Sequence, residues 1–147
     1  MSTIFINTDG GSRGNPGPAG IGVAFYNEDG DEIHRYGEFI GEATNNQAEY
    51  QAIIKGLEIL KKSKWYKAKN GSSAKIICRL DSQLVVEQIN GNYKVKNEEI
   101  KILKEKIDEI VMDMHIDKEF IHVPREENKL ADKMVNDVLD KELKKKK

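Results

Sequence analysis

The sequence has almost none of the residues that cross-link a protein covalently or anchor it in a membrane. Cys78 is the only cysteine among 147 residues, which excludes an internal disulfide and any cysteine-based zinc site. No apolar run approaches the ~20 residues that span a bilayer. A strand-like segment directly follows Met1-Ser2-Thr3, where a cleaved signal peptide would need an apolar core. We therefore expect a cytoplasmic protein that is not attached to a membrane and folds as one domain.

The chain also lacks an excess of charge of either sign, since 24 basic and 25 acidic residues give a net charge of −1. The charge is nevertheless segregated, because no acidic residue lies between Glu58 and Asp81 and the chain ends in four lysines. Such patches attract phosphate groups, although a lysine-rich loop and a tail are more often simply solvated. We expect a folded domain over residues 1–143 and a basic tail over residues 144–147. The basic residues of the internal segment are Lys61, Lys62, Lys64, Lys67, Lys69, Lys75 and Arg79.

Alternating hydrophobicity predicts three strands in the first 40 residues, over 4–9, 21–26 and 32–40. The stretch from Gly10 to Gly20 holds five glycines and two prolines, and we expect no regular element there. The turn over residues 27–30 joins the second and third strands as a hairpin. These strands are therefore predicted to form an antiparallel meander.

Helical periodicity begins after Thr44 or Asn45, either of which is a candidate cap. Helices are predicted over 45–60, 82–89, 100–114 and 130–143, and strands over 75–81 and 120–123. The lysine-rich segment before residue 75 is expected to be a loop. Strands that alternate with helices pair in parallel, so we predict an α/β fold. Its mixed five-stranded sheet has three antiparallel strands first, two parallel strands after them, and helices on its faces.

Four acidic residues lie at the ends of the predicted elements. Asp9 and Asp81 each end an apolar strand, while Glu49 and Asp132 lie in the first turns of two helices. If the two strands are neighbours, these carboxylates converge at one sheet edge, where divalent cations such as Mg²⁺ or Mn²⁺ would relieve their repulsion. Each acid alone is better explained by a turn or by the helix dipole. The surrounding motifs must decide.

Those motifs resemble the ribonuclease H type 1 family. The segments occur in the family's order and the resemblance covers essentially the whole chain. The first of them, with thirteen matching positions around Asp9, is highly specific. They are TDGGSRGNPGPAG over residues 8–20, TNNQAEY over 44–50, DSQ over 81–83 and NKLAD over 128–132.

The resemblance implies a ribonuclease H-like fold and a catalytic site of four metal-binding carboxylates. Two Mg²⁺ or Mn²⁺ ions would lie among them, one activating the attacking water and the other stabilising the leaving 3′-oxygen. The implied reaction is hydrolysis of the RNA strand of an RNA–DNA hybrid, which leaves 5′-phosphate and 3′-hydroxyl ends. The implied catalytic and metal-binding residues are Asp9, Glu49, Asp81 and Asp132.

The resemblance also implies how the hybrid is held. Small and amide side chains would meet its minor groove, where they can hydrogen-bond the 2′-hydroxyls that mark RNA. Thr44 matches a position that holds a phosphate of the DNA strand. We also expect a monomer, because no long apolar surface stripe in the sequence demands a partner. The implied minor-groove residues are Ser12, Asn15, Asn45, Asn46 and Gln83.

The sequence departs from the family's pattern in three places. The loop after the last strand is short and lacks the histidine that many members carry there; His122 precedes Pro124 and is expected to be a strand residue, and whether Glu126 or Glu127 substitutes is open. The basic helical protrusion of some bacterial members is absent, because residues 90–96 join two helices directly. Glu42 stands where some relatives place an arginine.

The missing protrusion directs attention to residues 61–67, where Trp65 and Tyr66 are interleaved with lysines. This segment is a candidate replacement handle for nucleic acid, although its aromatic side chains can equally pack against the body of the domain. Two other functions stay open for the whole chain. One is a related nuclease that also cuts double-stranded RNA. The other is a non-catalytic hybrid-binding module, against which the four acids argue.

Overall fold

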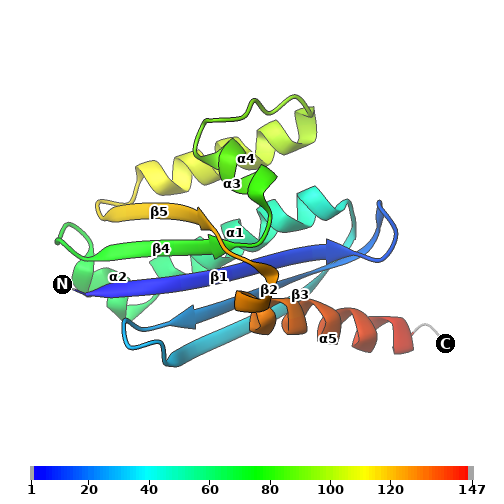
Figure 1. The fold of residues 1–147 in the computed structure, drawn as a ribbon, viewed down its shortest axis with the longest axis horizontal. Helices are drawn as coiled ribbons and strands as arrows, with labels where there is room; N and C mark the ends of the chain where they lie inside the picture. The colour runs from blue at the N-terminus through cyan, green and yellow to red at the C-terminus, as the bar shows by residue number, and fades with distance from the viewer. Residues whose placement is uncertain (1, 146–147) are drawn as a thin grey trace.

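The computed structural model describes residues 2–145, and they form one sheet covered by helices (Figure 1). The strand order is β3-β2-β1-β4-β5. The first three strands pair antiparallel, β4 pairs in parallel with β1, and β5 pairs in parallel with β4, which confirms the predicted fold class. The strands are β1 (Thr3–Ser12), β2 (Gly17–Tyr26), β3 (Glu32–Ala43), β4 (Lys75–Leu80) and β5 (Asp117–His122).

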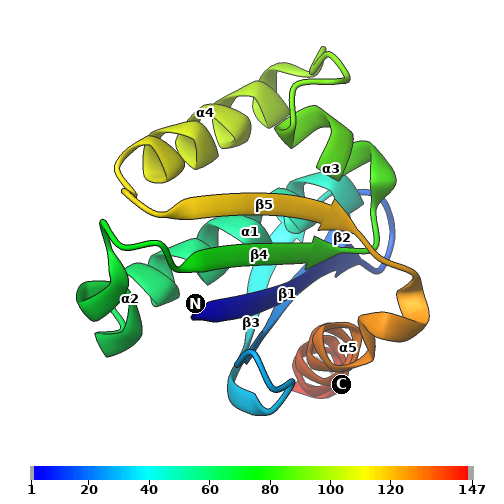
Figure 2. The same ribbon diagram turned by 60° about the vertical axis from the view of Figure 1, so that its left-hand side comes forward.

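The helices lie on both faces of this sheet (Figure 2). α1 packs against β1 and β2 on one face and lies between the sheet and α4, while α5 packs across β2 and β3 on the other face. No helix within residues 2–145 is long and apolar enough to cross a membrane. The helices are α1 (Asn45–Lys61), α2 (Lys64–Lys69), α3 (Gln83–Ile89), α4 (Glu98–Met112) and α5 (Lys129–Lys145), with a 3₁₀ turn over Arg125–Glu127.

The start of α1 is fixed by a reciprocal cap. The Gln47 backbone N–H donates to the Thr44 hydroxyl at 3.1 Å, and the Thr44 N–H donates to Gln47 Oε1 at 2.8 Å. Buried side chains then recur along one face of the helix and meet Ile6 and Ile76 of the sheet. Thr44 is therefore the N-cap, and the helix begins at a defined residue beside the ends of β1 and β4.

The prediction for the glycine-rich stretch was wrong. β1 continues to Ser12 and β2 begins at Gly17, so the ladder of paired residues reaches from Phe5 opposite Tyr26 to Ser12 opposite Ala19. Only about four residues form the connection, and the peptide bond between Asn15 and Pro16 is cis. The glycines were misinterpreted as breakers, although Gly10 and Gly20 lie where a neighbouring helix, α1 or α5, leaves little room for a side chain.

Two further differences concern helices. The segment expected to be a lysine-rich loop contains α2, which begins after Ser63, whose hydroxyl accepts a hydrogen bond from the Tyr66 N–H at 3.1 Å. α5 runs through Lys145, two residues into the expected tail. Lys146 and Lys147 lie outside the described residues.

Candidate active site

Three carboxylates from different elements meet where β1 runs on beyond the end of β4. Asp9 lies within β1, Asp81 directly follows β4, and Glu49 lies in the first turns of α1. Each offers an oxygen atom, and the three oxygens all lie within 4.8 Å of one another. Asp9 and Glu49 are only 8% and 7% exposed. The parallel pairing of β1 with β4 therefore brings together acids that are up to 72 positions apart in sequence.

Gly10 allows α1 to bring Glu49 this close. A Cβ atom at Gly10 would lie 2.2 Å from the backbone carbonyl carbon of Ala48, so any side chain would push the helix away. The Gly10 N–H donates to Glu49 Oε1 at 2.9 Å and fixes one of the two carboxylate oxygens. The glycine thus positions the helix and orients its acid.

The fourth acid, Asp132, lies in the first turn of α5. Asn128, which is fully buried, holds this end of the helix in place because its side-chain amide donates to the Thr8 carbonyl at 2.8 Å and its carbonyl accepts from the Asp132 N–H at 3.1 Å. Asp132 interacts with Asp9 but does not belong to the tightest group of three. Its carboxylate lies 3.6 Å from the Arg125 guanidinium.

Burial and mutual repulsion raise the pKa values of the clustered carboxyl groups. Burial raises the pKa of Asp9 to about 7; a hydrogen bond with Glu49 opposes this shift and the charges of Asp81 and Asp132 add to it. Burial, followed by the charge of Asp9, raises the pKa of Glu49 well above its usual value. Burial likewise raises the pKa of Asp81, while the Arg125 guanidinium opposes that shift. For all three carboxyl groups to be ionised at neutral pH, a cation must therefore lie close to them.

The donor set fits divalent metal ions. Glu49 Oε2 is buried and has no hydrogen-bond partner, which is a costly state unless a ligand completes it. Within residues 2–145, neither Asp9, Glu49 nor Asp81 forms an ion pair with a lysine or arginine. Oxygen-only ligands suit Mg²⁺ and Mn²⁺. Asp9, Glu49, Asp81 and Asp132 could therefore hold such ions between them.

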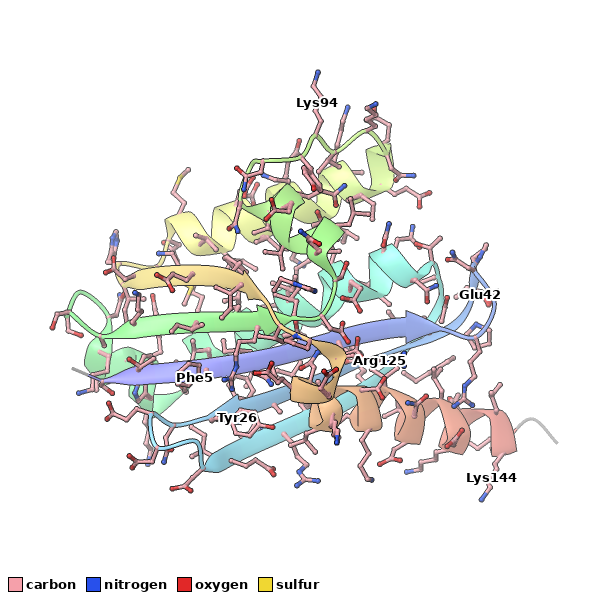
Figure 3. The ribbon with its side chains drawn as sticks, viewed as in Figure 1. Phe5, Tyr26, Glu42, Lys94, Arg125 and Lys144 are labelled. Carbon is pink, nitrogen blue, oxygen red and sulfur yellow. The ribbon has the colours of Figure 1, made fainter. Side chains whose placement is uncertain are left out.

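The acids form the floor of a cleft of about 470 Å³. Ser12, Asn45 and Asn46 line it on the side of the β1–β2 connection and α1. Arg125 lines it on the opposite side, and Figure 3 shows this residue beside the start of α5. The cleft is open and polar, with carboxylates at its base and amides and guanidinium groups around them.

Comparison with known proteins places this arrangement in a family. A family model described as reverse transcriptase-like matches residues 7–138. The chain is 38% identical over 132 residues to the ribonuclease HI of Halobacterium salinarum, which covers 90% of this chain and 62% of that protein. The crystal structure of LC11-RNase H1 in complex with an RNA/DNA hybrid matches with a TM-score of 0.87 and 44% identity, over 95% of this chain and 99% of that one. The chain belongs to the ribonuclease H type 1 family.

Some of these relatives are longer proteins. The chain is also 37% identical over 139 residues to a bifunctional protein of Mycobacterium tuberculosis, and that match covers 93% of this chain but 35% of the other. Both of these curated relatives match most of this chain, but the chain spans less than two thirds of each of them.

Apart from Gln83, the side chains expected to meet the hybrid lie around the β1–β2 connection and the start of α1. Asn45 links them, since its Oδ1 accepts from the Ser12 N–H at 2.9 Å and its own N–H donates to Asn15 Oδ1 at 3.0 Å. A second hollow, of about 390 Å³, adjoins the cleft here and is lined by Asn15, Thr44, Asn45 and Asn46. Gln83 lies exposed at the start of α3 and lines neither hollow.

The loop after β5 in this ribonuclease H type 1 chain, residues 123–128, contains no histidine. His122 is the last residue of β5, as expected, and is exposed. Glu126 and Glu127 lie in the 3₁₀ turn and do not line the cleft, whereas Arg125 does. Arg125 was missed in the sequence because an arginine in a short loop carries no motif of its own. The fold gives it its place.

The lysine-rich segment lies away from the cleft. α2 follows the C-terminal end of α1, and Lys61 at that end follows Glu49 by 12 residues, which span about 18 Å. Lys61 pairs with Asp113 at 2.7 Å and Lys75 with Glu119 at 2.9 Å. The placement argues against the interpretation of this segment as a handle for a hybrid bound in the cleft.

Proposed function

We propose that this protein is a metal-dependent endoribonuclease that hydrolyses the RNA strand of RNA–DNA hybrids and leaves 5′-phosphate and 3′-hydroxyl ends. The observation that carries the proposal is the buried group of Asp9, Glu49 and Asp81, whose oxygens approach within 4.8 Å at the base of an open cleft. The family relationship supports it, since a member that matches 95% of this chain was crystallised with an RNA/DNA hybrid. We take residues 1–143 as the active domain, acting as a cytoplasmic monomer.

Asp9, Glu49, Asp81 and Asp132 would hold two Mg²⁺ or Mn²⁺ ions. Two such ions supply an activated water molecule as the nucleophile and charge stabilisation for the leaving 3′-oxygen. The chain's part is to fix the ligands: the Gly10 N–H orients Glu49, and Asn128 holds the helix that carries Asp132. Because these contacts come from buried backbone and amide groups, the acids are set in place before substrate arrives.

The amide-rich edge of the cleft would select the hybrid. Ser12, Asn45 and Asn46 line the cleft beside the acids, within reach of a strand whose phosphate lies over them. Hydrogen bonds from these side chains, and from Asn15 and Gln83, would read 2′-hydroxyls through the minor groove. Thr44 would bind a phosphate of the DNA strand from the adjoining hollow.

Arg125 would place a positive charge against the phosphate that is cut. It is 77% exposed along its side chain, pairs with Asp132 at 3.6 Å and lines the cleft. A guanidinium group in this position can donate to the non-bridging phosphate oxygens as negative charge develops on them.

The test is a cleavage assay with end-labelled duplexes. Hybrid, double-stranded RNA and double-stranded DNA are incubated with the protein in Mg²⁺, Mn²⁺ or a chelator. We expect cleavage of the RNA strand of the hybrid alone, dependent on the divalent ion, with product ends verified by phosphatase sensitivity. Cleavage of both RNA-containing duplexes would favour the broader nuclease, and binding without cleavage in either metal would favour the non-catalytic module.

A further inference from the structure

A small apolar hollow lies at the opposite end of α1 from the active-site cleft. It has a volume of about 200 Å³, and its walls come from β1, β2, β3, α1 and α2. Of its two polar wall residues, Ser63 caps α2 and the His34 ring packs on Phe25 with 5.7 Å between ring centroids. The hollow is therefore lined almost entirely by hydrocarbon. Its apolar side chains are Ile4, Phe25, Ile33, Ile59, Leu60 and Trp65.

The side of the hollow formed by α2 is strongly basic. Lys62, Lys64 and Lys67 are exposed, and none of them forms an ion pair within residues 2–145. No acidic residue occurs from residue 59 to residue 80. These lysines are next in sequence to Ser63 and Trp65 of the wall, or two positions away, so this rim of the hollow carries a positive charge that no ion pair in residues 2–145 offsets.

The other rim has the opposite charge. Ile33 and His34 enter the hollow from the start of β3, and the β2–β3 turn just before them carries Glu28, Asp29 and Asp31, all exposed. A negatively charged chain that reaches the hollow is attracted over α2 and repelled from the turn. The charges therefore specify a direction of approach as well as a sign.

The form of the hollow favours a peptide over a nucleic acid or a small cofactor. Its volume lies below the ~300–1,000 Å³ typical of cofactor pockets, and it suits one large apolar side chain. A nucleic acid would instead need an open aromatic face on which bases stack. Trp65 does not offer that, because it packs against the core and its indole N–H donates to Ser2 Oγ at 3.2 Å.

We propose that this hollow and the lysines of α2 form a docking site for an acidic peptide segment of a partner protein, with one large apolar side chain as the anchor. The anchor fills the hollow between Ile33 and Trp65, and the acidic residues lie over Lys64 and Lys67. Because Leu60 in the wall of the hollow follows Glu49 by 11 residues along α1, a distance of about 17 Å, docking leaves the active-site cleft open. The site would thus bring the enzyme to a partner without competing with its substrate.

Trp65 is the only tryptophan in the chain and lines the hollow, so its fluorescence reports on this site alone. The probe is a blocked peptide of five alternating Asp and Glu residues followed by Leu and Phe, titrated in chelator without nucleic acid. We expect a saturable change in Trp65 emission that weakens with salt. Replacing Leu and Phe by Ser, or the acidic residues by Lys, should weaken binding at least ~10-fold. Equal binding of these control peptides would overturn the proposal.

Two variants locate the site on the protein. Ile33→Asp is expected to fold, because Ile33 is 51% exposed, and to bind the probe at least ~10-fold more weakly. Lys64→Glu with Lys67→Glu should do the same, whereas the matched pair Lys106→Glu with Lys141→Glu, at exposed lysines elsewhere, should bind normally. Both hollow variants should cleave hybrid at the unaltered rate. Normal probe binding by both would refute the site.

Two other results would assign the hollow to another occupant. Loss of hybrid or single-stranded DNA binding in the Lys64→Glu, Lys67→Glu variant would identify a nucleic-acid contact. Trp65 emission that depends on protein concentration without peptide would identify a second copy of the chain. Each result contradicts the peptide proposal. Since the titration contains neither metal nor hybrid, its outcome is independent of whether the protein is a nuclease.

Discussion

Asp9 interacts with each of the other three acids of the cleft, so its loss should affect the site most. We expect Asp9→Asn to lower hybrid cleavage by at least ~100-fold, since removing a metal ligand costs more than removing a residue that only supports one. Hybrid binding in chelator should change little, because the proposed groove contacts come from other residues. Single-turnover cleavage and a binding titration separate the two effects. Near-normal turnover in this variant would contradict the assignment of the four acids.

Arg125 offers a second test at a single side chain. Arg125→Ala should lower cleavage by roughly ten- to a hundredfold, the value of a hydrogen bond to a charged group. Its unfolding temperature should stay close to that of the parent because the ion pair with Asp132 is largely exposed. Arg35→Ala removes an exposed, paired arginine outside the cleft and serves as the control. If both variants cleave equally well, Arg125 has no part in the reaction.

The packing of α5 on the sheet depends on glycines in β2 and β3. A Cβ atom at Gly22 would lie 2.1 Å from the Ala131 carbonyl oxygen, one residue before Asp132. Gly22→Ala should therefore displace the start of α5 and destabilise the fold by about 1–3 kcal/mol. Gly37→Ala meets the same helix at two side-chain ends, Met134 Cε and Val138 Cγ1, both 3.0 Å away, and should cost less. Urea denaturation measures both, and an equal cost for the two would contradict this account.

Close packing at glycines also explains why the strands and helices could be predicted only in part. The order of strands and helices follows from periods of two and of 3.6 residues, which are local properties. The extension of β1 over residues 10–12 cannot be predicted from local sequence, because Gly10 reflects the close approach of the α1 backbone to the strand. α2 was missed for a related reason. Its lysines look solvated in the sequence, and the feature that fixes the helix is the burial of Tyr66 against the core.

The acidic residues of the candidate site could be predicted from the sequence, whereas some of the residues around them could not. Asp9, Glu49, Asp81 and Asp132 lie at the ends of elements and within the family's motifs, and parallel pairing of β1 with β4 is enough to bring Asp9 and Asp81 together. Arg125 and the apolar hollow beside Trp65 could not be predicted. Both depend on residues from separate elements that become neighbours only when the whole sheet is assembled.

The stability of the whole molecule should depend on pH through the buried acids. The pKa of Asp9 is raised from 3.8 to about 7 in the folded state, and that of Glu49 is raised too. Between pH ~4 and ~7 the folded protein therefore holds protons that the unfolded chain releases, so its stability falls as pH rises. In chelator, we expect the free energy of unfolding to drop by more than ~1 kcal/mol from pH 5 to pH 8.

Divalent ions should reverse this loss, because a bound cation replaces the protons that the acids would otherwise need. Mg²⁺ should therefore raise the unfolding temperature more at pH 8 than at pH 5. Asp9→Asn removes one of the raised carboxyls, so in chelator its stability should fall less steeply with pH than that of the parent. Parallel pH profiles for parent and variant, together with an Mg²⁺ stabilisation that is equal at pH 5 and pH 8, would contradict a raised pKa of Asp9 in the folded protein.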